Sequence, residues 1–382
     1  MIVVYDLEQL VNFHSCYAID VKSGTHYYFE LSDFNDDSKE YYEWLMNVDG
    51  MIGFNNLDYD YPLLHHFIKL YESGNKKFNQ NLYPKSQEII DAEYPAIKNP
   101  RIPQLDVYRI CHFNNKAKAT GLKDVQIMLR WHNVQDMPYK HYEKIDSVEK
   151  ANSIKEYNRN DVESTLAFYK EIYDRVSLRK KLAKQYKIPC MNWDDSMIGE
   201  EIMIKECANI NKVSPWSFKT SYKGEYIPIK QCFVHYQIVN EEIIEQKNKF
   251  AKLSLTNEQF KGSIKDRLVI DGFPFDFGSG GIHGCATSQY VIPKDDEKIK
   301  SSDVSSYYPN LAIQFGFYIK QFGMNFIKVL SNLYKIKQES KKNGDKISLK
   351  YVKLALVSIF GKSNSKFSKL FDPYYFLTTT IK

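Results

Sequence analysis

Five side chains near the start of this sequence have the residue types and the spacing for chemistry that uses two metal ions. Asp6 and Glu8 lie in VVYDLEQL, Asp60 in GFNNLDYDYP, and Tyr157 with Asp161 in YNRNDVEST. Hydrolysis of a phosphodiester at neutral pH requires charge relief for the attacking and leaving oxygens, and two divalent ions about 4 Å apart supply it. Because carboxylates are preferred ligands of Mg²⁺ and Mn²⁺, the four acids predict a site for two such ions.

Three local elements must position these side chains. IVVYDLEQL is typical of a buried strand, on which Asp6 and Glu8 would share a face. Pro62 predicts a helix that begins near Asp60, and the four-residue spacing of Tyr157 and Asp161 places both on one face of a further helix. Asp161 would then bind metal while the tyrosine hydroxyl orients the attacking water. Each group also has an alternative interpretation without catalysis. Asp6 and Glu8 could be acids at an exposed strand end, Asp60 could cap a helix, and Tyr157 with Asp161 could be an ordinary pair on a helix surface.

The ordered set D-x-E, N-x-x-Y-D and Y-x-x-x-D resembles the motifs of the 3′→5′ proofreading exonucleases of the DEDD superfamily, tyrosine subclass. The resemblance covers residues 1–175. It implies an α/β fold of the ribonuclease-H-like class with a central mixed sheet. It also implies removal of 3′-terminal nucleotides as 5′-monophosphates, with Asn56 contacting the DNA.

A second acidic motif, DVSSYYPN, follows a Gly-rich turn, GSGGIHG. The motif resembles motif A of family B DNA polymerases, and the turn resembles the segment of that family that contacts the template-primer. The resemblance implies that Asp303 binds both catalytic metals with help from the Val304 carbonyl, that Tyr308 packs under the incoming sugar, and that Gly280 and Gly281 approach the DNA. The alternatives are an aspartate that caps the next helix and a bare turn.

Two predicted helices with lysines follow, in NLYKIKQESKKNGDK and LKYVKLALVSIFGK. They resemble the finger helices of the same family, which implies that Lys337, Lys341 and Lys353 face the triphosphate of a dNTP. Val357 and Phe360 depart from the family pattern, which has asparagine and tyrosine at these places. Each lysine is alternatively a solvated surface charge.

The family's second palm carboxylate, in a D-T-D motif, does not follow Asp303 in this sequence, and FDPYYFLTTTIK at the end is typical of a strand. We therefore expect no DNA polymerisation by this chain alone, and we expect a second polypeptide to supply the remaining palm and thumb. A split enzyme, a truncated gene and an expression fragment remain open alternatives.

Four segments follow from these assignments: an exonuclease domain at 1–175, a connecting region at 176–266, a partial palm at 267–328, and fingers with the start of a return to the palm at 329–382. The expected fold is thus a ribonuclease-H-like α/β domain followed by a partial palm and helical fingers. The segment Leu178–Asp266 is predicted to be less regular, and a strand-like approach is predicted to lead into Asp303.

The charge of the chain is distributed unevenly. Its net charge is +5, yet twelve lysines and two acids between Lys320 and Leu370 give +10 there, which leaves −5 for the rest (5 − 10). This distribution fits an enzyme that grips a polyanion in one region and binds metals in another. The expected ligands are a single-stranded 3′ end, a primer-template and dNTP.

The class of protein follows from composition. No apolar run approaches a membrane span, and six cysteines without a CxxC pair indicate reduced thiols in a cytoplasmic setting. The resemblance to phage-type polymerases implies that this is the cytoplasm of a bacterial or phage-infected cell. Two other functions remain open: a non-catalytic DNA-binding or assembly subunit, and a stand-alone DEDD exonuclease that acts on RNA.

Overall fold

The chain divides into two compact units, Met1–Asp194 and Asp195–Lys382. Its structure is a computed structural model, which describes residues 1–92, 97, 100–115, 119–220, 222–233, 240–278, 281–286 and 288–381. The predicted boundary at residue 175 falls inside helix α7 (Tyr173–Tyr186) of the first unit. Arg179 explains why α7 belongs there. Its guanidinium is fully buried and donates to the carbonyl oxygens of Trp193 at 2.8 Å and Ile110 at 3.3 Å.

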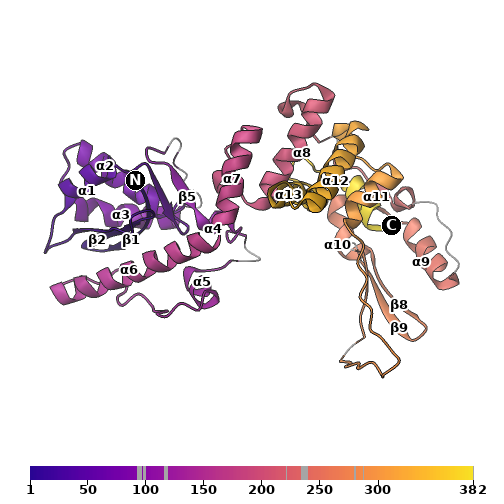
Figure 1. Ribbon diagram of the computed structural model, residues 1–382, viewed down its shortest axis with the longest axis horizontal. Helices are drawn as coiled ribbons and strands as arrows, with labels where there is room; N and C mark the ends of the chain where they lie inside the picture. The colour runs from indigo at the N-terminus through magenta and orange to yellow at the C-terminus, as the bar shows by residue number, and fades with distance from the viewer. Residues whose placement is uncertain are drawn as a thin grey trace. The chain divides into compact units, whose positions relative to one another are not determined.

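The first unit combines a sheet with helices (Figure 1). Its strands are β1 (Ile2–Leu10), β2 (Phe13–Asp20), β3 (His26–Leu31), β4 (Gly50–Gly53) and β5 (Gln104–Asp106). Its other helices are α1 (Ser38–Leu45), α2 (Asp60–Glu72), α3 (Phe78–Asp91), α4 (Val107–Ile110), α5 (Leu122–Met128) and α6 (Val148–Glu171). The predicted strand at IVVYDLEQL and the predicted helices after Asp60 and through Tyr157 are confirmed.

The five strands form one mixed sheet in the order β3-β2-β1-β4-β5. Strand β2 runs antiparallel to β1 and β3, whereas β4 runs parallel to β1, and β5 runs parallel to β4. The α/β class expected from the sequence is confirmed at this level. Strand β1, which carries the first two candidate ligands, lies in the middle of the sheet.

The alternation of side chains along β1 divides the interior of this unit between two faces. Val3, Tyr5 and Leu7 point into a cluster that also contains side chains of α1, α2 and α3. Val4 points to the opposite face, where the cluster includes Val162 and other side chains of α6. Asp6 and Glu8 follow Val4 in register, so they share the face that α6 covers.

The second unit contains more helix than sheet among its described residues. Its helices are α8 (Asp195–Asn211), α9 (Glu241–Ala251), α10 (Phe260–Ser263), α11 (Tyr307–Phe315), α12 (Asn325–Asn343), α13 (Lys346–Ser363) and α14 (Pro373–Ile381). Its strands are β6 (Ile227–Pro228), β7 (Ser254–Leu255), β8 (Lys265–Ile270), β9 (Phe273–Gly278) and β10 (Gly281–Gly284). The two predicted lysine-bearing helices are confirmed as α12 and α13. In the described part of the chain, no helix has both the length and the apolar character needed to cross a membrane.

Helices α8, α12 and α13 pack together as the core of this unit. Helix α8 lies inside the segment that was expected to be less regular, so that expectation is wrong for these residues. Close approach to α13 explains the glycine at position 199, since a Cβ there would lie 2.5 Å from the Leu354 carbonyl oxygen. Packing against α13 therefore stabilises α8, a helix that the spacing of apolar residues in the sequence did not predict.

The end of the chain is helix α14, and the predicted strand there is wrong. Asp372 precedes the helix and its Oδ1 accepts the Tyr375 N–H at 3.0 Å, a typical N-terminal cap. Thr379 and Thr380 donate their hydroxyls to carbonyls one turn earlier. The β-branched run is thus compatible with a helix, because capping and tertiary burial override its strand propensity.

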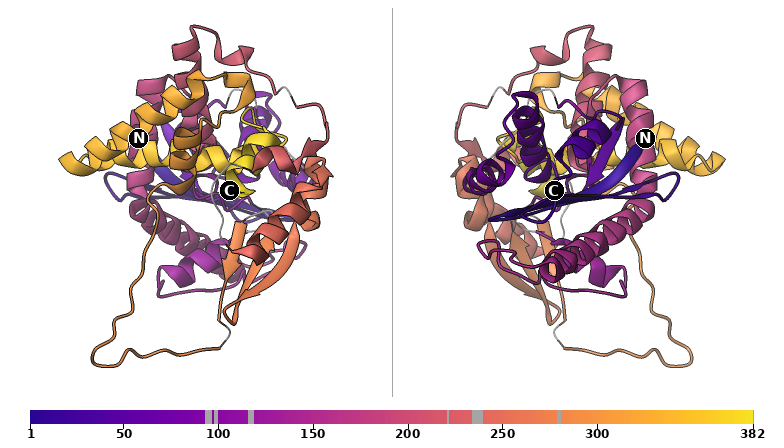
Figure 2. Two further views of the ribbon diagram at one scale, coloured as in Figure 1. Left: turned by 90° about the vertical axis from the view of Figure 1, so that its right-hand side faces the viewer. Right: turned by 90° about the vertical axis from the view of Figure 1, so that its left-hand side faces the viewer.

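Strands β8, β9 and β10 form an antiparallel sheet. Figures 1 and 2 show this sheet and the irregular segment after β10 extending away from the helices of the same unit. The strand expected to lead into Asp303 is absent, since the described residues from 285 to 306 form no strand. The described residues of this segment are mostly exposed and pair with no strand.

Candidate acidic metal centre

Strand β1 carries two carboxylates toward helix α6. Its register pairs Asp6 with Tyr17 and Glu8 with Ser15 on β2, which fixes both acids on the α6 face of the sheet. Glu8 is buried and Asp6 is half-buried. Placing two acids on an otherwise apolar, buried strand costs solvation energy, so the arrangement calls for a compensating positive charge.

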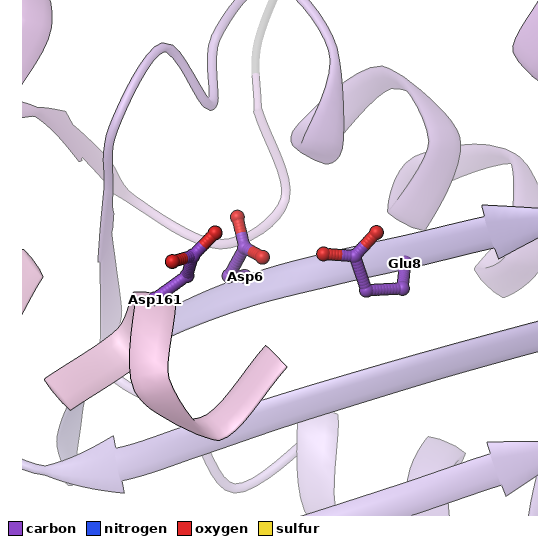
Figure 3. A group of neighbouring side chains, drawn as sticks. All are labelled: Asp6, Glu8 and Asp161. Carbon is purple, nitrogen blue, oxygen red and sulfur yellow. The ribbon is translucent and has the colours of Figure 1, made fainter. Parts of the chain in front are cut away.

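Helix α6 brings a third carboxylate to the same place. One carboxylate oxygen from each of Asp6, Glu8 and Asp161 lies within 4.8 Å of the others, although more than 150 residues separate β1 from Asp161. Figure 3 shows Asp6 and Glu8 rising from the strand with Asp161 beside them on the helix. The predicted convergence of these three acids is therefore confirmed, and their oxygens form a ligand set for a hard divalent cation.

Asp60 approaches from the start of α2. The pairing of β1 with β4 ends at Val4, so the backbone beyond it has a free hydrogen-bonding edge. The Leu7 N–H on that edge donates to Asp60 Oδ1 at 3.1 Å. This hydrogen bond ties the Asp60 carboxylate to the part of β1 that carries Asp6 and Glu8. The predicted position of Asp60 at a helix start is confirmed.

Burial raises the pKa of all four carboxyls, and the neighbouring carboxylates add to this effect for Asp6 and Glu8. Burial raises the pKa of Asp6, and the carboxylates of Asp60, Glu8 and Asp161 raise it further. Burial and the carboxylates of Asp161 and Asp60 likewise raise the pKa of Glu8. Burial raises the pKa of Asp60 to about 7, against the lowering effect of its bond from Leu7. Clustered acids of this kind mark functional sites, because a bound cation relieves both the desolvation and the repulsion.

Three neighbours hold the carboxylates in place by hydrogen bonds. Gln126 is fully buried, and its amide donates to Asp161 Oδ1 at 2.9 Å. Asn158 donates to Asp6 Oδ2 at 2.8 Å. The Tyr157 hydroxyl hydrogen-bonds to Asp161, which with Gln126 and Asn160 opposes the effect of burial in raising the pKa of that carboxyl. The sequence reasoning missed Gln126 and Asn158; polar residues on the buried faces of predicted helices were the available signal.

A pocket of about 520 Å³ opens over these groups. Besides the acids and Tyr157, it is lined by aromatic and small residues that sequence reasoning did not select, among them Phe54, Tyr59, Tyr108, Thr120 and Leu122. The rings of Phe54 and Tyr108 pack edge to face at 5.2 Å. Flat apolar walls beside a cluster of carboxylates suit a substrate that has both planar rings and phosphates.

Asn56 does not reach this pocket. It is fully buried, and its amide donates to Gln104 Oε1 at 2.8 Å, so the expected contact with DNA is corrected to a structural role. Asp106 is also fully buried and accepts the N–H groups of Asn55 and Leu57. These two residues shape the turn that precedes Asp60.

The polymerase-like residues lie in a different environment. Asp303 is exposed, and the Val304 residue is 59% exposed, both in the irregular segment before α11. Over the part of the chain that the structure describes, the acids near Asp303 form no group of three potential metal ligands. The geometry therefore brings together the acids of the first unit and not those of the second.

The other residues of the second unit that were expected to contact a nucleotide lie on α11, α12 and α13. Tyr308 stacks on Phe360 with ring centroids 3.8 Å apart and planes 3° from parallel. Lys337 donates to the Ser306 hydroxyl, whereas Lys341 and Lys353 are exposed to solvent.

The Gly-rich turn is only partly described. Gly281 has φ of +123°, a value that favours glycine, and it pairs with Gly278 across the turn. Gly280 lies outside the described residues.

No protein-family model matches this sequence, and no curated protein matches it. The chemical argument for a function therefore rests on the residues and geometry given above.

Proposed function

We propose that the first unit is a metal-dependent 3′→5′ exonuclease that removes nucleotides from DNA ends as 5′-monophosphates. We further propose that the whole chain is the N-terminal portion of a family B DNA polymerase of the phage type. A mixed sheet with acids on its central strand is compatible with the ribonuclease-H-like fold that this proposal requires.

One observation carries the nuclease proposal: the carboxylate oxygens of Asp6, Glu8 and Asp161 lie within 4.8 Å of one another. All potential ligands there are oxygens, which suits Mg²⁺ or Mn²⁺ better than softer metals. Burial raises the pKa of all four acids, and neighbouring carboxylates raise those of Asp6 and Glu8 further, so the site is electrostatically unfavourable without cations. The residues therefore fit a pair of divalent ions.

The chain's own groups have separable tasks in such a reaction. When bound, the two ions neutralise charge on the attacking and leaving oxygens. Asp6, Glu8 and Asp161 hold the ions, and Asp60 contributes directly or through water. The Tyr157 hydroxyl, one helical turn from Asp161, orients the water that attacks the terminal phosphate in line. The aromatic walls of the pocket hold the terminal base.

The second unit supports the polymerase part of the proposal less directly. The Tyr308–Phe360 stack offers a flat platform for a sugar, and the lysines of α12 and α13 offer charge for a triphosphate. Nucleotide addition needs two metal ions and hence a second carboxylate beside Asp303. We propose that a second polypeptide supplies it, and that this chain alone does not extend a primer.

The test is digestion of 3′-labelled single-stranded DNA in Mg²⁺ or Mn²⁺, with EDTA as the metal-free condition. We expect nucleotide release by the natural sequence and none by the double variant Asp6→Ala plus Glu8→Ala. Glu156→Ala removes an exposed acid next to Tyr157 and serves as the matched control.

The alternatives have distinct outcomes in the same assay. DNA binding that persists in EDTA, with no nucleotide release in metal, would support a non-catalytic DNA-binding subunit. Faster digestion of RNA than of DNA would support an RNA-directed nuclease. Equal release by the double variant would contradict the acidic metal centre.

A further inference from the structure

Two aromatic side chains of the second unit are exposed to an unusual degree. Trp216, in the short 3₁₀ turn Pro215–Ser217 after α8, is 78% exposed. Phe367, in the turn between α13 and α14, is 91% exposed. A single exposed apolar ring needs no explanation, but each of these two carries a cation over its face.

Both rings are attached to one small surface. The Lys369 Nζ lies over the Trp216 ring, 4.1 Å from its centroid, and the Lys366 Nζ lies over the Phe367 ring at 5.6 Å. Lys366 and Phe367 lie in a turn closed by the bond from the Ser368 N–H to the Ser365 carbonyl, and Lys369 lies in the next turn, closed by the bond from the Phe371 N–H to the Ser368 carbonyl. We call this the Trp216–Phe367 surface, made of Trp216, Lys366, Phe367 and Lys369.

The backbone under Trp216 is firmly anchored. Phe218, two residues after Trp216, is buried against Phe322, with ring centroids 4.5 Å apart. Thr220 donates its hydroxyl to the Phe371 carbonyl at 3.0 Å, which ties this loop to the end of the turn that carries Phe367. The ring therefore projects into solvent from a fixed support.

The backbone under Phe367 is anchored as well. Glu200 of α8 accepts the Ser368 hydroxyl at 2.8 Å and the Lys369 N–H at 2.9 Å. Gln321 donates its amide to the Lys369 carbonyl at 2.8 Å. Rings held on fixed loops lose little conformational entropy when a flat ligand stacks on them.

The charge of the surface favours an anion. Lys366 and Lys369 supply two ammonium groups over the rings. Glu200 faces Lys362 at 3.3 Å, so its carboxylate is already neutralised. Burial raises the pKa of Glu201, and the charges of Lys369 and Lys205 oppose that effect, so this carboxyl also has lysines beside it.

We propose that the Trp216–Phe367 surface binds single-stranded nucleic acid, with bases stacked on the two rings and phosphates beside the lysines. Aromatic platforms interleaved with cations are the general means of holding an unpaired strand without sequence preference, because every base has a flat face. A duplex hides these faces, so the surface selects single strands. This binding needs no strand end and no metal ion, and it is therefore independent of the acidic metal centre.

The experiment uses a closed circular single-stranded oligonucleotide, which offers no 3′ end to the proposed nuclease. Fluorescence anisotropy in EDTA measures its affinity for the full chain. We expect the double variant Trp216→Ala plus Phe367→Ala to bind at least tenfold more weakly, since stacking contributes about 1–3 kcal/mol per base. Trp216→Phe plus Phe367→Tyr keeps both flat faces and should restore binding. Tyr290→Ala, which removes an aromatic that is 89% exposed elsewhere in this unit, is the matched control.

Other outcomes would overturn the proposal. Unchanged affinity of the alanine variant, equal affinity for a closed duplex circle, or failure of the aromatic variant to restore binding would each do so. A change in self-association without a change in DNA affinity would assign the rings to a protein contact instead. Digestion of linear DNA is measured separately, so failure of the nuclease proposal and failure of this one are distinguishable.

Discussion

The two regions that carry the candidate catalytic aspartates differ in what surrounds the carboxylates. In the first unit, Glu8, Asp60 and Asp161 are each less than 9% exposed. Carboxylate oxygens of Glu8 and Asp161 lie within 4.8 Å of one of Asp6, and burial and the charge of Asp60 raise the pKa of Asp6. In the second unit, Asp303 stands exposed in an irregular segment. Burying several acids at one place is costly, and a structure that does so requires a cation to stabilise it. An exposed aspartate has no such requirement, so its position alone says little about function.

This difference predicts opposite sensitivities to the same substitution. Asp161→Asn should lower exonuclease activity about a thousandfold, because it removes a metal ligand's charge at the reacting phosphate. Asp303→Asn should leave exonuclease activity unchanged. Initial rates of nucleotide release from 3′-labelled DNA measure both, and comparable losses in the two variants would contradict the contrast between the regions.

The two tyrosines give a second, smaller test. Tyr157→Phe removes the hydroxyl that bonds to Asp161, and we expect a loss of about a hundredfold in the rate of release, as is typical when a group that positions the attacking water is removed. Tyr308→Phe makes the same change in the ring stacked on Phe360 and should have no effect on this rate. Full activity of Tyr157→Phe would mean that the attacking water is positioned by other groups.

Gln126 and Gln246 each donate an amide to a carboxylate, the first to Asp161 at 2.9 Å and the second to Asp266 at 2.7 Å. Gln126→Leu should weaken Mg²⁺ or Mn²⁺ affinity about tenfold, because partners of ligating groups orient them for the metal. Activity at saturating metal should largely return. Gln246→Leu should not change the metal concentration at which the rate is half-maximal. Titration of exonuclease activity with Mg²⁺ or Mn²⁺ measures both variants, and an equal shift in the two would contradict the role of Gln126.

The dependence of stability on pH should also have opposite signs in the two units. Burial raises the pKa of Asp60 to about 7, so in metal-free protein its contribution is fully favourable below pH 4 and is lost as pH rises toward 7. Asp60→Asn should therefore stabilise the metal-free protein at pH 8, by roughly 2 kcal/mol, with little change at pH 4. Added Mg²⁺ should reduce this advantage.

Asp266 is the matched case in the second unit. Hydrogen bonds from Lys249 and Gln246 lower its pKa to about 2, so its contribution is present above pH 4 and is lost as pH falls. Asp266→Asn should thus slightly destabilise the protein at pH 8. Urea unfolding at pH 4 and pH 8 in EDTA measures both variants, and a destabilised Asp60→Asn protein at pH 8 would refute the burial argument.

The periodicity of apolar residues in the sequence was sufficient to predict those helices and strands in which the periodic apolar residues are also the buried ones. Strand β1 and helices α2, α6, α12 and α13 follow from the alternation or the turn spacing of their apolar residues. It failed for α8 and α14, where contact with other helices and a capping aspartate decide the conformation. It also failed for Asn56, because nothing local distinguishes a buried amide from one that faces a ligand.

The sequence by itself determined which residues can ligate a metal and which of them share a strand or a helix, since side-chain type and backbone period are local properties. Only the tertiary structure decided that β1, α2 and α6 meet, that Gln126 and Asn158 hold the carboxylates, and that Asp303 stands apart. The physical reason is that proximity between distant segments depends on strand order and on the packing of helices onto the sheet, which no local window of residues specifies.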